Sequence, residues 1–367
     1  MPFNDAYSGR KVLITGHTGF KGSWLATWLD SLGAQVCGYS DAVPTTPSLF
    51  EKAGLAGRID HRLGDIRDLA RFSQVVKTFR PDFVFHLAAQ AIVSTSYNNP
   101  LETLDVNVMG TATVLEVLRD VDWPCTAVII TSDKVYDNVE WPWGYRETDA
   151  LGGKDVYSAS KGGAELAFKS YFHSFFTKSD VSVRLATARA GNVIGGGDWA
   201  ADRIVADCVR AWCEDRTVEI RSPRSTRPWQ HVLEPLSGYL WLGARLAQDA
   251  NYHGEAYNFG PRAEQNATVL ELLAALAEVW GHENPEHAYK VTGNIPFHEA
   301  SLLKLNVDKA LLALSWEPNL SYRECMTMTG EWYRDVLKGG NDALAMTQEH
   351  IASYERFALE RGRVWVA

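Results

Sequence analysis

Short apolar segments alternate with longer segments of helical spacing from residue 11 to residue 188. The apolar segments predict strands at residues 11–16, 34–40, 82–89, 127–132 and 182–188. The segments between them predict helices at residues 20–33, 68–79 and 101–120. Strands that alternate with helices are joined by right-handed crossovers, which gives a parallel sheet with helices on both faces. We therefore expect an α/β fold with a doubly wound parallel sheet.

The turn after the first predicted strand carries three evenly spaced glycines. In TGHTGFKG these are Gly16, Gly19 and Gly22. Gly16 would permit the tight turn, Gly19 the close approach of a pyrophosphate, and Gly22 the packing of helix on strand. Glycines also mark ordinary turns, but this triplet follows a strand and opens a helix, where free N–H groups favour an anion. The turn therefore predicts a dinucleotide site.

The end of the second predicted strand bears on the choice between NAD and NADP. Ser40 stands there, Asp41 follows it, and no arginine comes after the strand, which favours NAD over NADP. His17 and Lys21 lie inside the glycine turn, and we expect either to face a phosphate. The predicted cofactor-binding residues are Gly16, His17, Gly19, Phe20, Lys21, Gly22, Ser40, Asp65, Ile66, Leu87, Ala88 and Ala89, with Tyr157 and Lys161.

Tyr157 and Lys161 stand four residues apart on a predicted helix. Residues at this spacing share a helix face, so the phenol and the ammonium would point into one cleft. The ammonium is expected to lower the pKa of Tyr157 and make the phenol a usable base. A surface pair on an amphipathic helix would have the same spacing, but the glycine turn upstream and the Ser132 hydroxyl at a strand end favour the catalytic interpretation.

The glycine triplet, Ser132, Tyr157 and Lys161 together resemble the extended short-chain dehydrogenases/reductases that modify nucleotide sugars. The resemblance covers nearly the whole chain. It implies an NAD-binding Rossmann domain over residues 1–185. It also implies a smaller lobe, mainly for nucleotide-sugar binding, over residues 186–367, with some segments returning to the first domain. No metal site is expected.

Asp133 and Lys134 follow the strand-end serine, where epimerases of this group usually carry small or apolar residues. Asp133 stands where the 4,6-dehydratases of the group have their acid, and Lys134 replaces the glutamate of the commoner dTDP-glucose enzymes. With residues 191–200 and 225–240, this pair most resembles the dehydratases that act on CDP-glucose. The resemblance implies the catalytic set Ser132, Asp133, Lys134, Tyr157 and Lys161.

The implied reaction assigns each of these residues a role. Tyr157 would take the proton of the sugar C4 hydroxyl, oriented by Ser132, while hydride passes to the cofactor whose ribose Lys161 holds. Asp133 would protonate the departing C6 hydroxyl. Lys134 would either remove the C5 proton or stay charged and stabilise the enolate, and the sequence leaves both roles open.

Substrate-binding candidates are spread over the chain. Guanidinium groups bind phosphate in a bidentate way, although each arginine could equally make a structural ion pair. Arg227, in TRPWQHV, matches the family segment that clamps the diphosphate, and Tyr136 is expected as a wall of the sugar pocket. The predicted substrate-binding residues are Gln90, Tyr136, Asn192, Arg203, Arg221, Arg227, His298 and Glu299.

Composition limits the partners. A net charge of -9 argues against nucleic acid, and no apolar run is long enough to span a membrane. Five cysteines without a CxxC pair indicate reduced thiols in the cytoplasm. The resemblance implies a homodimer, or a tetramer, with Met109, Val114, Leu115 and Leu118 at a helical interface.

Two other functions stay open beside a CDP-glucose 4,6-dehydratase in deoxysugar and O-antigen synthesis. One is a related enzyme, either another nucleotide-sugar 4,6-dehydratase or a 4-epimerase, and Asp133–Lys134 argues against the epimerase. The other is a non-catalytic module that senses the cofactor. Such modules commonly lose the tyrosine–lysine pair, which stands here.

Overall fold

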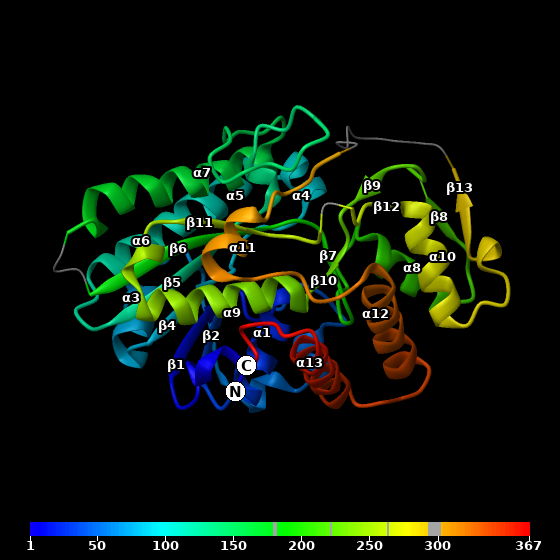
Figure 1. The fold of residues 1–367 in the computed structure, drawn as a ribbon, viewed down its shortest axis with the longest axis horizontal. Helices are drawn as coiled ribbons and strands as arrows, with labels where there is room; N and C mark the ends of the chain where they lie inside the picture. Colours follow the sequence, from blue (N-terminus) through cyan, green and yellow to red (C-terminus); the bar gives the residue numbers. More distant parts are fainter. Residues whose placement is uncertain (179–181, 221, 263, 293–301) are drawn as a thin grey trace.

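A seven-stranded parallel sheet forms the centre of the molecule (Figure 1). The computed structural model describes residues 1–178, 182–220, 222–262, 264–292 and 302–367. The strand order is β11-β6-β5-β4-β1-β2-β3, so the direction of winding reverses between β1 and β4. The strands are β1 (Lys11–Thr15), β2 (Gln35–Ser40), β3 (Asp60–Leu63), β4 (Phe83–His86), β5 (Cys125–Ile130), β6 (Val183–Ala190) and β11 (Ala256–Phe259). The predicted doubly wound α/β fold is confirmed, and ligands of such sheets bind at the carboxyl ends of the strands beside the reversal.

Helices cover both faces of the sheet, which explains why its strands are apolar without alternation. Successive residues of β1 enter different cores: Val12 and Ile14 pack with helices α1 and α9, whereas Leu13 packs with α3 and α6. One face carries α3 (Leu69–Phe79), α6 (Gly110–Arg119) and α7 (Val156–Tyr171). The other carries α1 (Phe20–Ser31) and α9 (Leu233–Gln248), and α13 (Ala343–Glu360) packs on α1.

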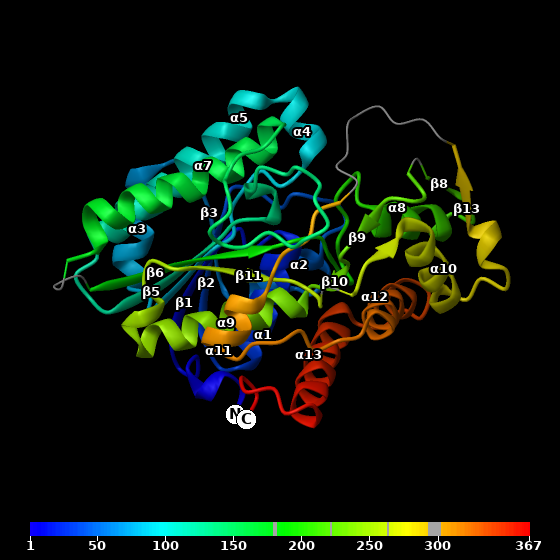
Figure 2. The same cartoon turned by 45° about the horizontal axis from the view of Figure 1, so that its top comes forward.

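A smaller lobe lies beyond the carboxyl ends of the strands, on the right in Figure 2. It contains α8 (Ile204–Cys213), α10 (Val269–Trp280), α12 (Tyr322–Leu337), and the strand pairs β8 (Val218–Ile220) with β13 (Tyr289–Val291) and β9 (Thr226–Arg227) with β12 (Ala267–Thr268). The pair β7 (Val193–Ile194) and β10 (Gln230–His231) joins it to the sheet. The chain returns to the sheet at α9, β11 and α11 (Asp308–Leu314), and the expected boundary at residue 185 falls inside β6.

A single hydrophobic cluster runs from one face of the sheet into this lobe. It joins Val128 of β5 and Leu240 of α9 to Trp212 of α8, Leu272 of α10 and Trp332 of α12. Short elements complete the fold: α2 (Leu49–Lys52), α4 (Val93–Asn98), α5 (Pro100–Leu104) and the turns η1 (Pro2–Asp5), η2 (Leu55–Gly57), η3 (Asp105–Met109), η4 (Asp133–Val135), η5 (Phe172–Phe176), η6 (Ala250–Tyr252) and η7 (Pro285–Ala288).

The predicted helix at residues 101–120 is one helical run with a π turn, η3, between α5 and α6. Asn107 in this turn accepts a hydrogen bond from the Gln90 N–H (2.8 Å) and donates to the Gln90 carbonyl (3.0 Å) and to Ser160 Oγ (2.8 Å). A π turn changes which side chains face inward. Here it lets one asparagine join the loop after β4 to α7.

Three of the four predicted interface residues belong to the core of the protomer. Val114, Leu115 and Leu118 are at most 1% exposed and pack beneath the sheet, because they form the inner face of α6. The prediction that they contact a partner is therefore wrong, whereas Met109 is 55% exposed.

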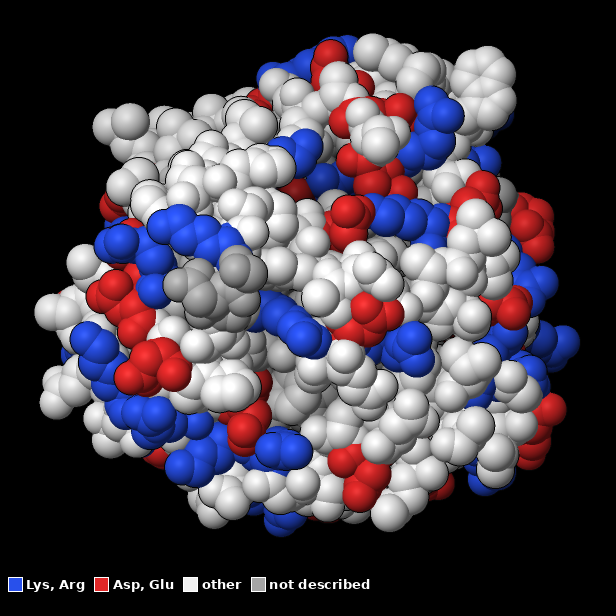
Figure 3. Space-filling model, turned by 60° about the vertical axis from the view of Figure 1, so that its left-hand side comes forward, with Lys and Arg blue, Asp and Glu red and all other residues white. Residues whose placement is uncertain are grey.

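The surface shown in Figure 3 intersperses lysine and arginine with aspartate and glutamate. Within the described ranges, no helix is both long and apolar enough to cross a membrane. All five cysteines are free thiols, and only Cys213 is exposed.

Candidate active site

A cleft of about 1100 Å³ opens at the carboxyl ends of the strands, between the sheet and the smaller lobe. Its lining comes from the glycine turn, the ends of β2, β4 and β5, the start of α7 and residues 190–205. The following predicted residues all line it: Gly16, Gly19, Phe20, Lys21, Gly22, Ser40, Asp65, Ile66, Leu87, Ala88, Ala89, Gln90, Ser132, Asp133, Lys134, Tyr136, Tyr157, Lys161, Asn192, Arg203 and Arg227. Arg221, His298 and Glu299 lie outside the described residues.

His17 is a correction to the predicted cofactor residues. Its imidazole is buried beneath the glycine turn, with Nδ1 2.8 Å from Ser40 Oγ and Nε2 2.7 Å from His61 Nδ1. Burial lowers its pKa to about 4, so the ring is neutral near pH 7. Gly38 makes room for it, since a Cβ there would lie 2.2 Å from the ring. The expectation that this side chain faces a phosphate is wrong.

The glycine turn has the geometry that a dinucleotide site needs. Gly16 has φ +78°, and a Cβ there would lie 2.7 Å from the Ala88 nitrogen. A Cβ on Gly22 would lie 2.1 Å from the Gly16 carbonyl oxygen, so α1 packs directly on the turn. At Gly19 only the Gly16 oxygen comes within 4 Å, at 3.4 Å. Packing within the chain therefore requires glycine at Gly16 and Gly22, while Gly19 leaves space in the cleft before the first N–H groups of α1.

Ser132, Asp133 and Lys134 form a short capped turn at the end of β5. Ser132 Oγ accepts a hydrogen bond from the Lys134 N–H (3.2 Å) and donates one to Asp133 Oδ1 (2.9 Å). Asp133 is buried and Lys134 half-buried. The carboxylate and the amine thus meet the cleft together, where parallel sheets present their reactive groups.

Tyr157 and Lys161 lie on the first two turns of α7, which begins at the Asp155 cap. Lys161 Nζ is 5.9 Å from the centroid of the Tyr157 ring. Burial raises the pKa of Tyr157, and Arg203 and the hydrogen bond with Ser132 only partly oppose it. The predicted lowering by Lys161 is therefore wrong for the chain by itself. Burial and the neighbouring Lys21 also lower the pKa of Lys161 to about 8.

Lys21 lies in the same part of the cleft as Asp133, Lys161 and Arg203, with which it interacts electrostatically. Burial and Arg203 lower its pKa to about 8, while the Asp133 carboxylate opposes this. Its Nζ lies 5.9 Å from the centroid of the Tyr239 ring. Two amines of lowered pKa and one carboxylate therefore share the space beside Tyr157, an arrangement suited to moving protons.

Several of the remaining cofactor and substrate candidates already make hydrogen bonds or ion pairs within the chain. Asp65 is paired with Arg67 (2.5 Å). Gln90 donates to Thr103 Oγ1 (2.9 Å), and the Tyr136 hydroxyl contacts Arg189 and Asn258. Asp41 lines the cleft beyond β2, where an acid suits the adenosine ribose of NAD.

Sequence reasoning missed the polar residues behind the site, chiefly Glu165 and Arg189. Glu165 follows Tyr157 and Lys161 at helical spacing, and Arg189 precedes the glycine-rich segment at residues 191–197. The i+4 step from Lys161 could have identified Glu165. Its pairing with Arg189 depends on strand order and has no local signal.

The sheet, the glycine turn and the serine, tyrosine and lysine of the cleft define a nucleotide-binding short-chain dehydrogenase/reductase of the extended, sugar-modifying type. The profile of the GDP-mannose 4,6 dehydratase family matches residues 13–329. The chain belongs to this family.

A curated relative agrees with this assignment, and solved structures share the fold. The chain is 44% identical over 351 residues to the CDP-glucose 4,6-dehydratase of Salmonella typhimurium, covering 95% of this chain and 97% of that one. The epimerase Mth375 of Methanothermobacter thermautotrophicus superposes with a TM-score of 0.76 at 25% identity, over 92% and 96% of the two chains. A dTDP-glucose 4,6-dehydratase of Streptomyces venezuelae with NAD bound superposes with a TM-score of 0.74 at 22% identity, over 91% and 99%.

Proposed function

We propose that the chain is a CDP-glucose 4,6-dehydratase, which converts CDP-D-glucose to CDP-4-keto-6-deoxy-D-glucose and water. The observation that carries the proposal is the Asp133–Lys134 pair, set at a strand end in the same cleft as Ser132, Tyr157 and Lys161. An oxidation alone needs only the last three residues. Elimination of water also needs an acid and a base, and this cleft supplies both.

The residues of the cleft fit NAD. Gly19 leaves room for a pyrophosphate before α1, and Asp41 beyond β2 suits a ribose without a 2′-phosphate. Bound NAD would accept hydride from C4 of the sugar and return it to C6. Lys161 would hold the nicotinamide ribose, and its amine, with a pKa of about 8, is mostly charged near pH 7 and would favour the Tyr157 phenolate.

Tyr157 would take the proton of the C4 hydroxyl as its phenolate, which the Lys161 ammonium and the positive charge of bound nicotinamide would favour, while Ser132 orients the hydroxyl by a hydrogen bond. Asp133 gives a proton to the leaving C6 hydroxyl. Lys134 either removes the C5 proton or stabilises the enolate oxygen, and its half-buried position suits both roles. After hydride returns to C6, a proton returns to C5, which completes the 4-keto-6-deoxy product. Asn192, Arg203 and Arg227 line the part of the cleft where the diphosphate would lie.

The helical face formed by α5, η3 and α7 supports a homodimer. Leu101, Met109 and Leu166 on this face are 80%, 55% and 56% exposed, and the three elements pack side by side. Large exposed apolar side chains in one area are typical of a protein interface. A tetramer would need a second surface.

The product would feed deoxysugar and O-antigen synthesis.

The test is to incubate the purified protein, without added cofactor, with CDP-glucose and in parallel with dTDP-, UDP- and GDP-sugars, and to follow mass. Loss of one water from CDP-glucose alone is expected and would also indicate a co-purified nucleotide. An isomer of unchanged mass would identify an epimerase, and water loss from another sugar nucleotide would change the substrate. If the protein reacts with none of these sugar nucleotides, even with NAD or NADP added, a non-catalytic cofactor-sensing module becomes the favoured function.

A further inference from the structure

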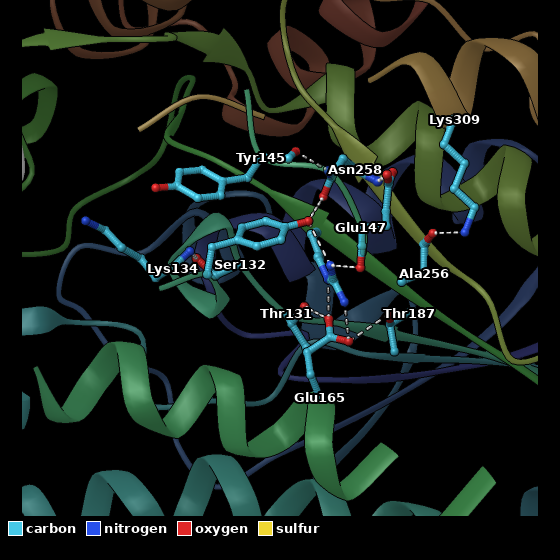
Figure 4. Close-up of polar contacts among 12 residues, drawn as sticks. Thr131, Ser132, Lys134, Tyr145, Glu147, Glu165, Thr187, Ala256, Asn258 and Lys309 are labelled. Carbon is cyan, nitrogen blue, oxygen red and sulfur yellow. Dashed lines mark hydrogen bonds and ion pairs between the residues drawn. The ribbon is translucent and has the colours of Figure 1, made fainter. Parts of the chain in front are cut away.

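A fully buried ion pair lies directly behind the catalytic turn. Arg189 Nε and Nη2 donate to the two carboxylate oxygens of Glu165 at 2.8 and 2.9 Å, and the two side chains are 0% and 1% exposed (Figure 4). The charge of Arg189 and its hydrogen bonds lower the pKa of Glu165 despite burial, so the carboxylate stays ionised. A buried pair of this kind adds little net stability, because desolvation offsets the attraction. Its role is therefore better sought in positioning.

The pair holds both ends of the catalytic turn. Thr131, the residue before Ser132, donates to Glu165 Oε1 at 2.7 Å. At the other end, Arg189 Nη1 donates to the Tyr136 hydroxyl at 2.7 Å, and that hydroxyl donates to Asn258 Oδ1 at 2.8 Å. We call Glu165, Arg189 and Tyr136, with these contacts, the clamp.

The clamp should affect the positions of the proposed catalytic residues on η4 more than the positions of those on α7. Tyr157 and Lys161 belong to the 16-residue helix α7, which fixes their spacing. Asp133 and Lys134 stand on η4, a turn of only three residues. The Lys134 side chain points away from Glu165 (Figure 4). The position of this turn therefore depends on how its flanking residues are held.

We infer that the clamp is a positioning device for elimination: it sets the place of Asp133 and Lys134 against C6 and C5 of the sugar, and the first oxidation depends on it far less. The inference rests on the proposed function. Misplacement of a catalytic group by about 1 Å costs on the order of 100-fold in rate. Loosening the turn is therefore expected to slow water loss and leave the oxidation by Tyr157 nearly intact.

The variant Tyr136→Phe tests this, because it removes the hydroxyl and keeps the ring that stacks on Tyr145 at 5.1 Å. Tyr145→Phe is the matched control, since that hydroxyl bonds Asn138 and the Val139 N–H outside the clamp. In single-turnover experiments with CDP-glucose, Tyr136→Phe should slow water loss at least about 10-fold. Its oxidation rate should change less than about 3-fold, so that reduced cofactor accumulates. Tyr145→Phe should resemble the wild type.

A second readout does not depend on turnover. Amide hydrogen exchange across residues 132–136 should speed up in Tyr136→Phe and not in Tyr145→Phe. Equal slowing of both steps, or unchanged exchange, would overturn the clamp. If Tyr136→Phe does not fold, Thr131→Val releases the other end of the turn and decides by the same criteria. Wild-type protein that never loses water from CDP-glucose would refute the proposed function, and the exchange result would still stand by itself.

Discussion

Alanine at Gly22 and alanine at Gly19 should have opposite consequences, although the two residues belong to one turn. At Gly22 the new Cβ would lie 2.1 Å from the Gly16 oxygen and 2.7 Å from the His17 Cα. Both are backbone atoms, so no side-chain rotation relieves the clash, and α1 must move off the turn. Overpacking of this kind costs about 1–3 kcal/mol.

The upper end of that range gives a measurable shift. With an unfolding entropy of roughly 2.1 cal/mol/K per residue over 367 residues, about 3 kcal/mol lowers the melting temperature by about 4 °C. At Gly19 the Cβ meets only the Gly16 oxygen, at 3.4 Å, and stands in the cleft. Gly19→Ala should therefore melt with the wild type but bind NAD at least about 10-fold more weakly, a loss of about 1.4 kcal/mol.

Calorimetry for melting and titration with NAD for binding provide the assay. Gly57→Ala is the control for the substitution itself, because no atom lies within 4 Å of a Cβ there. Gly22→Ala that melts with the wild type would refute the packing argument. Gly19→Ala that binds NAD normally would refute the placement of the pyrophosphate.

Three further predictions concern the chemistry, the stability and the assembly. Lys134→Met should still reduce the cofactor with CDP-glucose, as followed by absorbance, but should eliminate water from the sugar at least about 100-fold more slowly, as followed by mass. Equal slowing of both steps would show that Lys134 has no specific role in elimination. Burial raises the pKa of Glu234 from 4.5 to about 7, so the folded state binds the extra proton and stability falls by roughly 3 kcal/mol as pH rises between these values. In urea unfolding at several pH values, Glu234→Gln should lack this component, and an identical pH profile for both proteins would contradict it. Leu166→Glu should convert the proposed homodimer to monomers in light scattering, and a mass equal to that of the wild type would show that α7 does not form an interface.

Local signals predicted much of the fold. The helix predicted at residues 68–79 forms α3 (Leu69–Phe79), and Asp68 caps its start by accepting a hydrogen bond from the Arg71 N–H. The glycines at Gly16 and Gly22 have the predicted steric reasons. Strand β3 was missed because DHRL, at the edge of the sheet, has no apolar run, and its side chains stay partly exposed.

Local sequence signals also predicted part of the candidate site, while the rest depends on contacts between distant segments. Spacing along one helix placed Tyr157 and Lys161 in a cleft, and a strand end placed Ser132, Asp133 and Lys134 there. The sequence could not show that His17 turns beneath its own loop, because Gly38 and His61, which receive it, come from β2 and β3. It could not reveal the Glu165–Arg189 pair either, since that contact depends on the neighbouring positions of α7 and β6.

The hydrophobic cluster that runs from the sheet into the smaller lobe determines how the protein unfolds. Val128 and Leu240 beside the sheet share one apolar cluster with Trp212 and Leu272 of the lobe. Parts that share a core lose their packing together, so damage on the nucleotide-sugar side also weakens the cofactor side. Heating should therefore give one cooperative transition, and a substitution as far from the glycine turn as Leu272→Ala should lower the temperature at which NAD is released.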